Sequence, residues 1–304
     1  MAAKKKSDPT PHFILPHLHK ALQDSESVQR QSGTTNYPSS ASIVHEKKGV
    51  RLVTGACLRA EYWRRTHEPK TNPPDAQGYL KMLIGKVVEE ALVNLIKEKG
   101  MWRGNNIKFF EPEVEASGEA DVFFWLDRLN GLEIKTGYGY YFSKSVLDAK
   151  TGMPKDDHLL QTFFYLKQAW NFDGEQVTLP CWNILYMDRG DGADKEFYIF
   201  SRDGNDLWIG SQHQKPVKHP YITWEGIKKR MEESDAFVNT GMLPPNDYVL
   251  KFTPERAKQL FDLGEMSKTA YKKFVDNKPG IKGDWRCAYC NWKDTCLKVG
   301  QEKT

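Results

Sequence analysis

Apolar residues recur every three to four positions between residues 76 and 99, and Gly100 follows this pattern. Such spacing predicts one long amphipathic helix that ends at the glycine. Strand-like runs come next at residues 107–114, 120–126 and 131–136, separated by short turns. The apolar positions of the helix are Leu80, Leu83, Ile84, Val87, Val88, Ala91, Leu92, Leu95 and Ile96.

The second half of the chain repeats this alternation of helix and strand. A helix is expected over residues 156–170, and strands are expected over 181–188 and 196–201. Thr253 is followed by proline and glutamate, which predicts a further helix start, and Gly264 ends that helix. The order of the elements predicts an α/β core with mixed strands.

Residues 1–45 are rich in Lys, Ser, Thr, Gln and Pro and show no sustained periodicity. We expect them to form a disordered or loosely docked tail, with the ordered chain beginning near Val50. A chain of 304 residues is long enough for two domains or for one large decorated domain. We expect residues 46–304 to form a single decorated domain.

Charge and hydropathy limit the class of protein. No stretch approaches the roughly 20 consecutive apolar residues of a membrane span, and the first residues lack the apolar segment of a secretion signal. We therefore expect a soluble, cytoplasmic protein without a membrane partner. Residues 251–304 carry 12 Lys and Arg against 7 Asp and Glu, whereas the preceding residues sum to −1. This basic end permits contact with nucleic acid but does not require it.

Three of the five cysteines lie close together, as Cys287-x2-Cys290-x5-Cys296. In a reducing compartment such thiols are metal ligands more often than disulfide partners. Cys57 is the best candidate for a fourth ligand, because Cys181 lies in an apolar run that suits a buried thiol. A centre held by these four would join distant segments and stabilise the fold. Ligand chemistry leaves zinc and an iron–sulfur cluster equally open.

Two carboxylates and a lysine fall on neighbouring strands of the expected sheet. Side chains alternate along a strand, so Glu133 and Lys135 share one face, and Asp121 on the preceding strand can meet them. Such a group can bind Mg²⁺, which activates a water for attack on phosphorus. Lys135 would orient or deprotonate that water, or offset charge on the phosphate. The same three residues would also form an ordinary ion pair on a sheet edge.

The long helix carries a further carboxylate pair, Glu89 and Glu90. Each lies about 130° from the centre of the apolar stripe, on opposite sides, so helix geometry does not choose between them. Either side chain could border a cleft. Both also suit a solvated helix face.

Candidate nucleic-acid contacts follow on either side of the second helix. Gln161 and Tyr165 are adjacent on one helical face, where they could hold a phosphate or a base. Tyr138, Tyr140 and Lys144 mix aromatic rings with a cation, as single-stranded nucleic acid requires. The alternatives are a polar rim on a buried helix and aromatic residues of a turn.

Six short motifs occur together in one order and cover residues 50–170 and 284–297. They are Cys57-Leu-Arg-Ala-Glu-Tyr-Trp, Gly85-x3-Glu89, Gly118-x2-Asp121, Glu133-Ile-Lys135-Thr136, Gln161-x3-Tyr165 and Cys287-x2-Cys290-x5-Cys296. Each motif is weak singly, whereas the ordered set is specific. With this set the chain resembles the RecB-like branch of the PD-(D/E)XK nucleases. Within that branch it is most similar to the iron–sulfur exonucleases related to the CRISPR-associated Cas-four proteins and to the AddB nuclease.

The resemblance implies a restriction-endonuclease-like fold, in which helices flank a mixed central sheet. It also implies a site in which Asp121, Glu133 and Lys135 are catalytic and Gln161 and Tyr165 contact DNA. The implied ligands of Mg²⁺ or Mn²⁺ are Glu89, Asp121, Glu133 and the carbonyl of Ile134. The implied ligands of a [4Fe-4S] cluster, which would join the N- and C-terminal segments, are Cys57, Cys287, Cys290 and Cys296. The family therefore favours iron–sulfur over zinc.

The activity that the resemblance implies is metal-dependent exonucleolytic cleavage of single-stranded DNA or DNA ends, from the 5′ end, in recombination, repair or phage- or CRISPR-type processing. The sequence departs from the family at Glu89, where histidine is usual. A carboxylate keeps a metal ligand at that position, which favours Glu89 over Glu90. Residues 1–45 and 190–280 exceed the compact family core, and the later region could extend the DNA-binding surface. The alternative is a non-cleaving DNA-binding or assembly module with a structural metal cluster.

Overall fold

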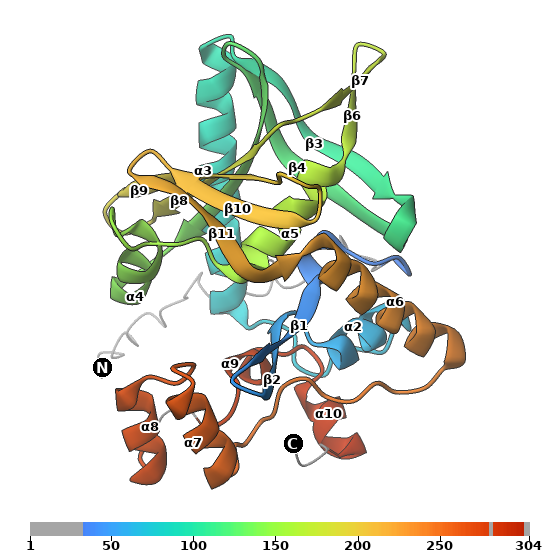
Figure 1. Ribbon diagram of the computed structural model, residues 1–304, viewed down its shortest axis with the longest axis vertical. Coiled ribbons are helices and arrows are strands. Elements are labelled where there is room, and N and C mark those ends of the chain that lie inside the picture. The colour runs from blue at the N-terminus through green and yellow to red at the C-terminus, as the bar shows by residue number, and fades with distance from the viewer. Residues whose placement is uncertain (1–32, 280–281, 301–304) are drawn as a thin grey trace, which may run out of the picture.

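The computed structural model describes residues 33–279 and 282–300 (Figure 1). Its strands are β1 (Ser42–Lys47), β2 (Val50–Gly55), β3 (Trp102–Glu111), β4 (Ala116–Trp125), β5 (Leu129–Gly137), β6 (Ala169–Phe172), β7 (Glu175–Thr178), β8 (Trp182–Asp188), β9 (Asp194–Phe200), β10 (Asp206–Ser211) and β11 (Gln214–Thr223). Its α-helices are α2 (Leu58–Arg65), α3 (Ala76–Glu98), α4 (Tyr140–Phe142), α5 (Asp156–Lys167), α6 (Trp224–Thr240), α7 (Pro254–Asp262), α8 (Lys268–Val275), α9 (Trp285–Ala288) and α10 (Lys293–Val299). Short helical turns lie at η1 (Pro38–Ser40), η2 (Pro112–Val114) and η3 (Ser143–Leu147).

A seven-stranded mixed sheet occupies the centre of the molecule, in the order β11-β10-β9-β8-β5-β4-β3. Neighbouring strands are antiparallel except β5 and β8, which pair in parallel from Gly131–Trp182 to Gly137–Asp188. A parallel pair requires a crossover connection, and α5 lies in that connection. The expected α/β core with mixed strands flanked by helices is confirmed.

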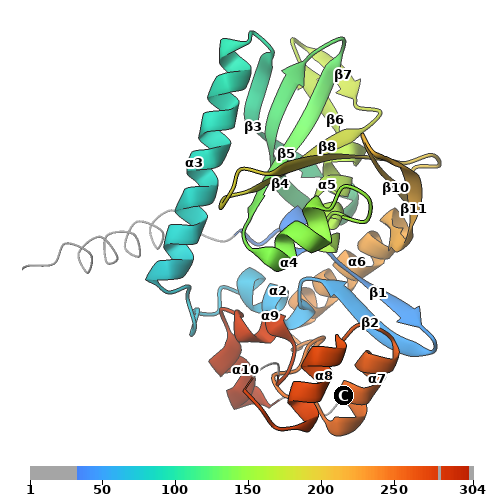
Figure 2. The same ribbon diagram turned by 90° about the vertical axis from the view of Figure 1, so that its left-hand side faces the viewer.

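The sheet separates two apolar cores (Figure 2). Side chains alternate along β8, so Ile184 and Tyr186 enter the large core that also contains Leu160 and Phe163 of α5. Leu185 points the other way and packs against a smaller core that includes α3. Because α3 contacts β3 and β5 while α5 contacts β8 and β9, each face of the sheet is covered over a different part.

The local patterns locate the main helices well. α3 begins at Ala76, as expected, with Asp75 capping the helix through a hydrogen bond from Gly78 N–H. α7 begins after Thr253, whose side chain accepts a hydrogen bond from Arg256 N–H. α5 ends at Lys167, earlier than expected, because the following backbone is extended and joins β6.

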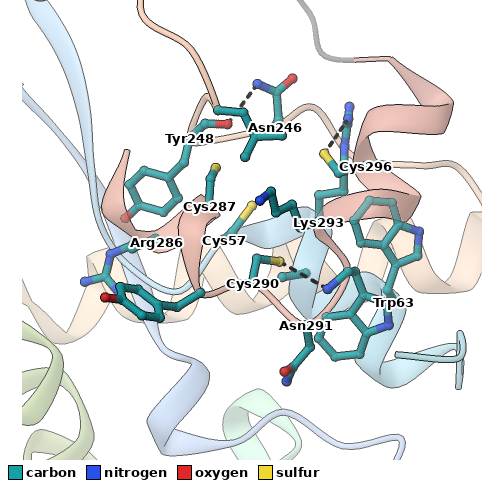
Figure 3. Close-up of a pocket in the computed structure, with 15 residues that line it drawn as sticks. Cys57, Trp63, Asn246, Tyr248, Arg286, Cys287, Cys290, Asn291, Lys293 and Cys296 are labelled. Atoms are coloured by element: carbon teal, nitrogen blue, oxygen red, sulfur yellow. Dashed lines mark hydrogen bonds between the residues drawn. The ribbon is translucent and has the colours of Figure 1, made fainter. Parts of the chain in front are cut away.

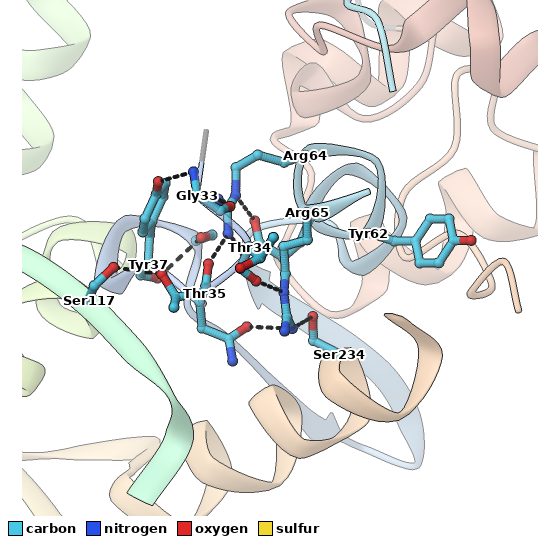
Figure 4. Close-up of polar contacts among 12 residues, drawn as sticks. Gly33, Thr34, Thr35, Tyr37, Tyr62, Arg64, Arg65, Ser117 and Ser234 are labelled. Atoms are coloured by element: carbon cyan, nitrogen blue, oxygen red, sulfur yellow. Dashed lines mark hydrogen bonds and ion pairs between the residues drawn. The ribbon is translucent and has the colours of Figure 1, made fainter. Parts of the chain in front are cut away.

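The N-terminal segment is ordered earlier than the sequence suggested. Two arginines of α2 hold its backbone (Figure 4): Arg64 Nη1 donates to Gly33 O at 2.8 Å and Arg65 Nε donates to Thr34 O at 2.7 Å. β1 then pairs with β2 and buries Ile43. The expected tail therefore ends too late, and its residues 1–32 lie outside the described part of the chain.

Residues 190–280 are more than an addition to a compact core. Most of β9 and all of β10 and β11 belong to the central sheet, so this region completes it. The later helices α7 and α8 form a small separate core with β2, around Leu52, Phe252 and Leu260. Within the described residues, no helix is long and apolar enough to cross a membrane.

Candidate functional site

Asp121 lies where β4 and β5 separate. The register between the two strands ends at the pair Val122–Leu132. Just beyond it, Asp121 Oδ2 accepts a hydrogen bond from Ile134 N–H at 3.1 Å. The backbone of β5 therefore holds this carboxylate beside the charged residues of the same strand.

Glu133 is fully buried on β5 and forms an ion pair with Lys135. Neither carboxylate oxygen of Glu133 has a hydrogen bond of ordinary geometry within the described chain. Burial raises the pKa of Glu133 to about 8, against the attraction of Lys135 and with the repulsion of Asp121. Burial would lower the pKa of Lys135, but the two carboxylates outweigh it and raise that pKa. A buried carboxylate with so few donors is one that a cation would stabilise.

Glu89, and not Glu90, is the helix carboxylate that belongs to this group. Glu90 is exposed, whereas Glu89 is half-buried. Burial raises the pKa of Glu89 to about 7, and the charge of Asp121 raises it further while Lys135 lowers it. These charges act on Glu89 because α3 lies close to β5 at Gly85, where an added Cβ would lie 3.4 Å from Thr136 Oγ1.

The structure thus brings Glu89, Asp121, Glu133 and Lys135 together from α3, β4 and β5. Across residues 33–279 and 282–300, no three or more His, Cys, Asp or Glu side chains are arranged so that they could hold a metal ion. The donors suit a hard divalent cation, because three are carboxylates and two of these keep raised pKa values. Their present arrangement is that of an ion pair beside two further carboxylates.

Gln161 and Tyr165 lie on α5, on the large-core side of the sheet. Tyr165 is only 1% exposed, and its hydroxyl donates to Glu119 O at 3.0 Å while Gln161 Nε2 donates to the same hydroxyl at 2.7 Å. Both residues line a cavity of about 510 Å³ with Lys108 and Tyr37. The ring of Tyr165 therefore offers no open face to a base, and its place in the structure is that of a support for β4.

His158 was not singled out from the sequence. It lies one turn before Gln161 on α5, with Nδ1 2.8 Å from the hydroxyl of Tyr186. Burial holds its pKa well below the ordinary value, and the nearby Lys135 charge lowers it further. The i, i+3 spacing to Gln161 was the available signal, but an isolated histidine on a helix is common.

Tyr138, Tyr140 and Lys144 lie beyond the end of β5. The rings of Tyr138 and Tyr140 are 74% and 79% exposed, and Lys144 Nζ lies 5.9 Å from the centre of the Tyr140 ring. Exposed rings beside a cation are available for stacking, unlike the buried ring of Tyr165.

Four cysteines line one cavity of about 220 Å³ between α2 and the C-terminal segment (Figure 3). They are Cys57, Cys287, Cys290 and Cys296. Asp247 helps to fix the first of them, because its Oδ2 accepts from Leu58 N–H at 2.7 Å. Trp63 and Trp292 pack with the buried Cys296 and close the apolar side. Segments that are far apart in the sequence thus meet at this cavity.

The thiols of the cavity are held in their protonated form. Burial raises the pKa of Cys57 to about 11, and the charge of Asp247 raises it further. Burial also raises the pKa values of Cys287 and Cys290. Two donors already face the sulfurs: Arg59 Nη1 lies 3.7 Å from Cys296 Sγ and Trp292 N lies 3.4 Å from Cys290 Sγ.

Cys181 lies apart from this group. It precedes β8, is half-buried rather than fully buried, and borders a different cavity of about 920 Å³ with Lys195 and Glu196. Its sulfur lies 3.8 Å from Arg128 Nη2. The separation of Cys181 from the other four cysteines agrees with the sequence, whereas its expected full burial is wrong.

An ion pair connects the cysteine cavity with the helix of the acidic site. Arg286, which precedes Cys287, pairs with Asp157 in the first turn of α5. Its guanidinium also lies 5.5 Å from the ring centre of Tyr248, another residue of the cavity wall. The two candidate centres are therefore mechanically linked through α5.

Comparisons with known proteins give little guidance. No protein-family model matches the chain, and no curated protein matches it. Among solved structures, the crystal structure of SSO0001 is similar over 75% of this chain and 88% of that one, with 14% sequence identity and a TM-score of 0.41.

Proposed function

We propose that this chain is a metal-dependent DNA exonuclease of the RecB-like PD-(D/E)XK type that acts on single-stranded DNA or DNA ends. One observation carries the proposal: Glu89, Asp121, Glu133 and Lys135 converge from three separate elements. Three carboxylates and one lysine beside a buried strand cost stability unless they serve a purpose. Phosphodiester hydrolysis requires this combination of groups.

Each residue has a distinct role in this proposal. Glu89, Asp121, Glu133 and the carbonyl of Ile134 hold Mg²⁺ or Mn²⁺. The bound ion supplies polarisation of the phosphate and an activated water. Lys135 leaves its pair with Glu133, orients or deprotonates the attacking water and offsets charge on the phosphate. Gln161 and Tyr165 hold β4 in position from α5.

The four cysteines are proposed to bind a [4Fe-4S] cluster. A single zinc ion holds each sulfur at about 2.3 Å, so four thiolates would have to close tightly around one point. The cavity of about 220 Å³ is larger than one ion requires, which suits a cluster better. Within the proposal, Cys57, Cys287, Cys290 and Cys296 are its ligands, and the cluster fastens the C-terminal segment to α2.

DNA is proposed to approach along the exposed rings of Tyr138 and Tyr140 with Lys144 beside them. The basic C-terminal segment adds a further attraction for phosphate. Attack from the 5′ end follows from the family resemblance alone.

An end-labelled nuclease assay tests the proposal. Anaerobically purified protein is incubated with single-stranded DNA labelled at the 5′ or the 3′ end, with Mg²⁺, Mn²⁺ or EDTA. We expect metal-dependent release of labelled mononucleotides or short products, first from the 5′ label. The proposal is wrong if cluster-containing protein releases no product, or if Asp121→Asn and Lys135→Met leave cleavage unchanged.

The second candidate is a DNA-binding or assembly module that no longer cleaves. The contact of Lys135 with Glu133 favours it, because this ion pair occupies the carboxylate that a cation would need. Such a module would retain DNA in a salt-sensitive manner without any metal-dependent product. The same assay, read together with a binding measurement, distinguishes the two.

A further inference from the structure

The helix α3 turns its apolar stripe away from the sheet. At 100° per residue, the side that faces the sheet contains Gly85, Glu89 and Val93, and the stripe is centred about 130° from that side. Four large side chains of the stripe remain exposed, namely Leu83 (42%), Ile84 (47%), Val87 (55%) and Leu95 (54%). An amphipathic helix of a monomer normally buries its apolar side.

This exposed stripe is continuous and long. It follows one side of α3 from Leu80 to Leu95, which is about 22 Å of helix. The helix stands at one side of the molecule, apart from the lower helices (Figure 2). Contiguous apolar surfaces of this kind mark sites of association.

The positions in the stripe are symmetric about a point between Val87 and Val88. An antiparallel copy of the helix centred there places Leu80 opposite Leu95 of the second copy, and Ile84 opposite its Ala91. Every apolar position then meets another apolar position, and each large residue near one end meets a residue at the other. A twofold axis requires this kind of self-complementarity.

The charges beside the stripe show the same symmetry. Lys86 and Glu90 lie on one flank of α3, and both are exposed. In the antiparallel arrangement, Lys86 of each chain lies within one residue of the level of Glu90 of the second copy. Two equivalent pairs of opposite charge therefore border the apolar contact, as the flanks of helical pairs do.

From this self-complementary stripe we infer that the chain forms a twofold-symmetric homodimer through an antiparallel α3–α3 contact. Glu89 points to the sheet side, so both acidic sites stay open in the dimer. The inference is independent of the proposed nuclease activity, because it depends on the outer side of α3 only.

Sedimentation velocity of the full chain over a concentration series gives the first test. We expect a reversible monomer–dimer equilibrium with the dimer dominant at tens of micromolar. A chain that stays monomeric at the highest soluble concentration overturns the inference. In that case another segment, such as residues 1–32, or another protein covers the stripe.

Substitutions on the stripe locate the contact. Ile84→Glu combined with Val87→Glu places four charges in the apolar seam and should weaken dimerisation at least about a hundredfold. Lys229→Glu, an exposed position on α6, is the control for added acidic charge and should dimerise as the wild type does. A dimer that is unchanged in the Ile84→Glu, Val87→Glu variant overturns the inference, provided that circular dichroism shows the native helix content.

A charge exchange tests the antiparallel register without touching the apolar seam. Lys86→Glu alone and Glu90→Lys alone should each weaken the dimer, because each places like charges opposite one another. An equimolar mixture of the two variants should form a mixed dimer more tightly than either variant pairs with itself. A mixture no tighter than the separate variants contradicts the register.

Discussion

The amide of Ile134 donates a hydrogen bond to Asp121 Oδ2 at 3.1 Å, across the point where β4 and β5 separate. This bond holds the carboxylate against the strand that carries Glu133 and Lys135. The amide needs an acceptor whether or not the carboxylate has a catalytic role, so fold and activity can be tested separately at this position.

Asp121→Asn is expected to lower the turnover of the proposed nuclease at least about a hundredfold while preserving the fold. The asparagine oxygen can still accept from Ile134 N–H, so the free energy of unfolding should change by less than about 1 kcal/mol. Asp121→Ala removes the acceptor and should cost about 1–3 kcal/mol. Product release from end-labelled DNA and urea unfolding measure the two effects.

Glu90→Gln is the matched control for that experiment. Glu90 lies next to Glu89 in the sequence but is exposed, so its amide variant should keep activity within about twofold. Full activity of Asp121→Asn, or equal losses in the two variants, would exclude the assigned role of Asp121.

The raised pKa values of Glu133 and Glu89 predict how the affinity for divalent cations depends on pH. Burial raises these pKa values to about 8 and about 7 in the metal-free chain. A cation needs both groups as carboxylates, so binding displaces one proton between pH 7 and 8 and two below pH 7. The affinity for Mn²⁺ should therefore fall up to about tenfold from pH 8 to 7, and up to about a hundredfold per unit below that.

Calorimetric titration with Mn²⁺ in buffers of different ionisation enthalpy counts these protons directly. Glu89→Gln removes the group with the pKa of about 7, so only the proton of Glu133 should remain to be displaced. An affinity that is flat between pH 6 and 8.5, with no proton release, would mean that these carboxylates do not bind the ion.

The cysteine cavity predicts a difference between two single substitutions. Cys57→Ser should abolish most bound iron and the brown colour of anaerobically purified protein, because Cys57 lines the cavity with the C-terminal three. Cys181→Ser should retain both, because Cys181 borders a different cavity. Iron and zinc analysis with visible absorption measures the outcome. Colourless wild-type protein with stoichiometric zinc would instead support a zinc centre.

Periodicity in the sequence identified the elements because helix and strand formation depend on neighbouring residues. The 23 residues of α3 and the start of α7 agree with their patterns and caps. The side that a helix turns to the core depends on partners far away in the sequence. The apolar stripe of α3 was legible, but its outward orientation was not, because the smaller core needs only Val93 and its neighbours.

The same limit explains the site residues. The choice of Glu89 over Glu90 could not be made from helix geometry, whereas the contact of α3 with β5 decides it. Tyr165 has the spacing of a surface residue relative to Gln161, yet the ring packs among Phe109, Trp170 and Trp182. Order in residues 33–45 depends on arginines of α2 that follow later in the chain.

The exposed tyrosines after β5 predict a contact with single-stranded DNA that differs from that of Tyr165. Stacking of one base on an aromatic ring contributes about 1–3 kcal/mol. Tyr138→Ala combined with Tyr140→Ala should therefore weaken binding of a labelled oligonucleotide by about tenfold or more, measured by fluorescence anisotropy in EDTA so that no cleavage occurs. Trp125→Ala, which removes an exposed ring at the opposite end of β4, should leave the affinity within about twofold.

Lys144 should affect the same binding through its charge and not through stacking. Its ammonium lies 5.9 Å from the ring centre of Tyr140, close enough to meet the phosphate of a nucleotide stacked there. A phosphate contact releases a counterion, so Lys144→Gln should reduce the slope of log affinity against log salt by about 1. The tyrosine variants should instead lower affinity at every salt concentration with the slope unchanged. If both kinds of variant alter only the slope, the rings do not stack on bases, and this surface attracts DNA by charge alone.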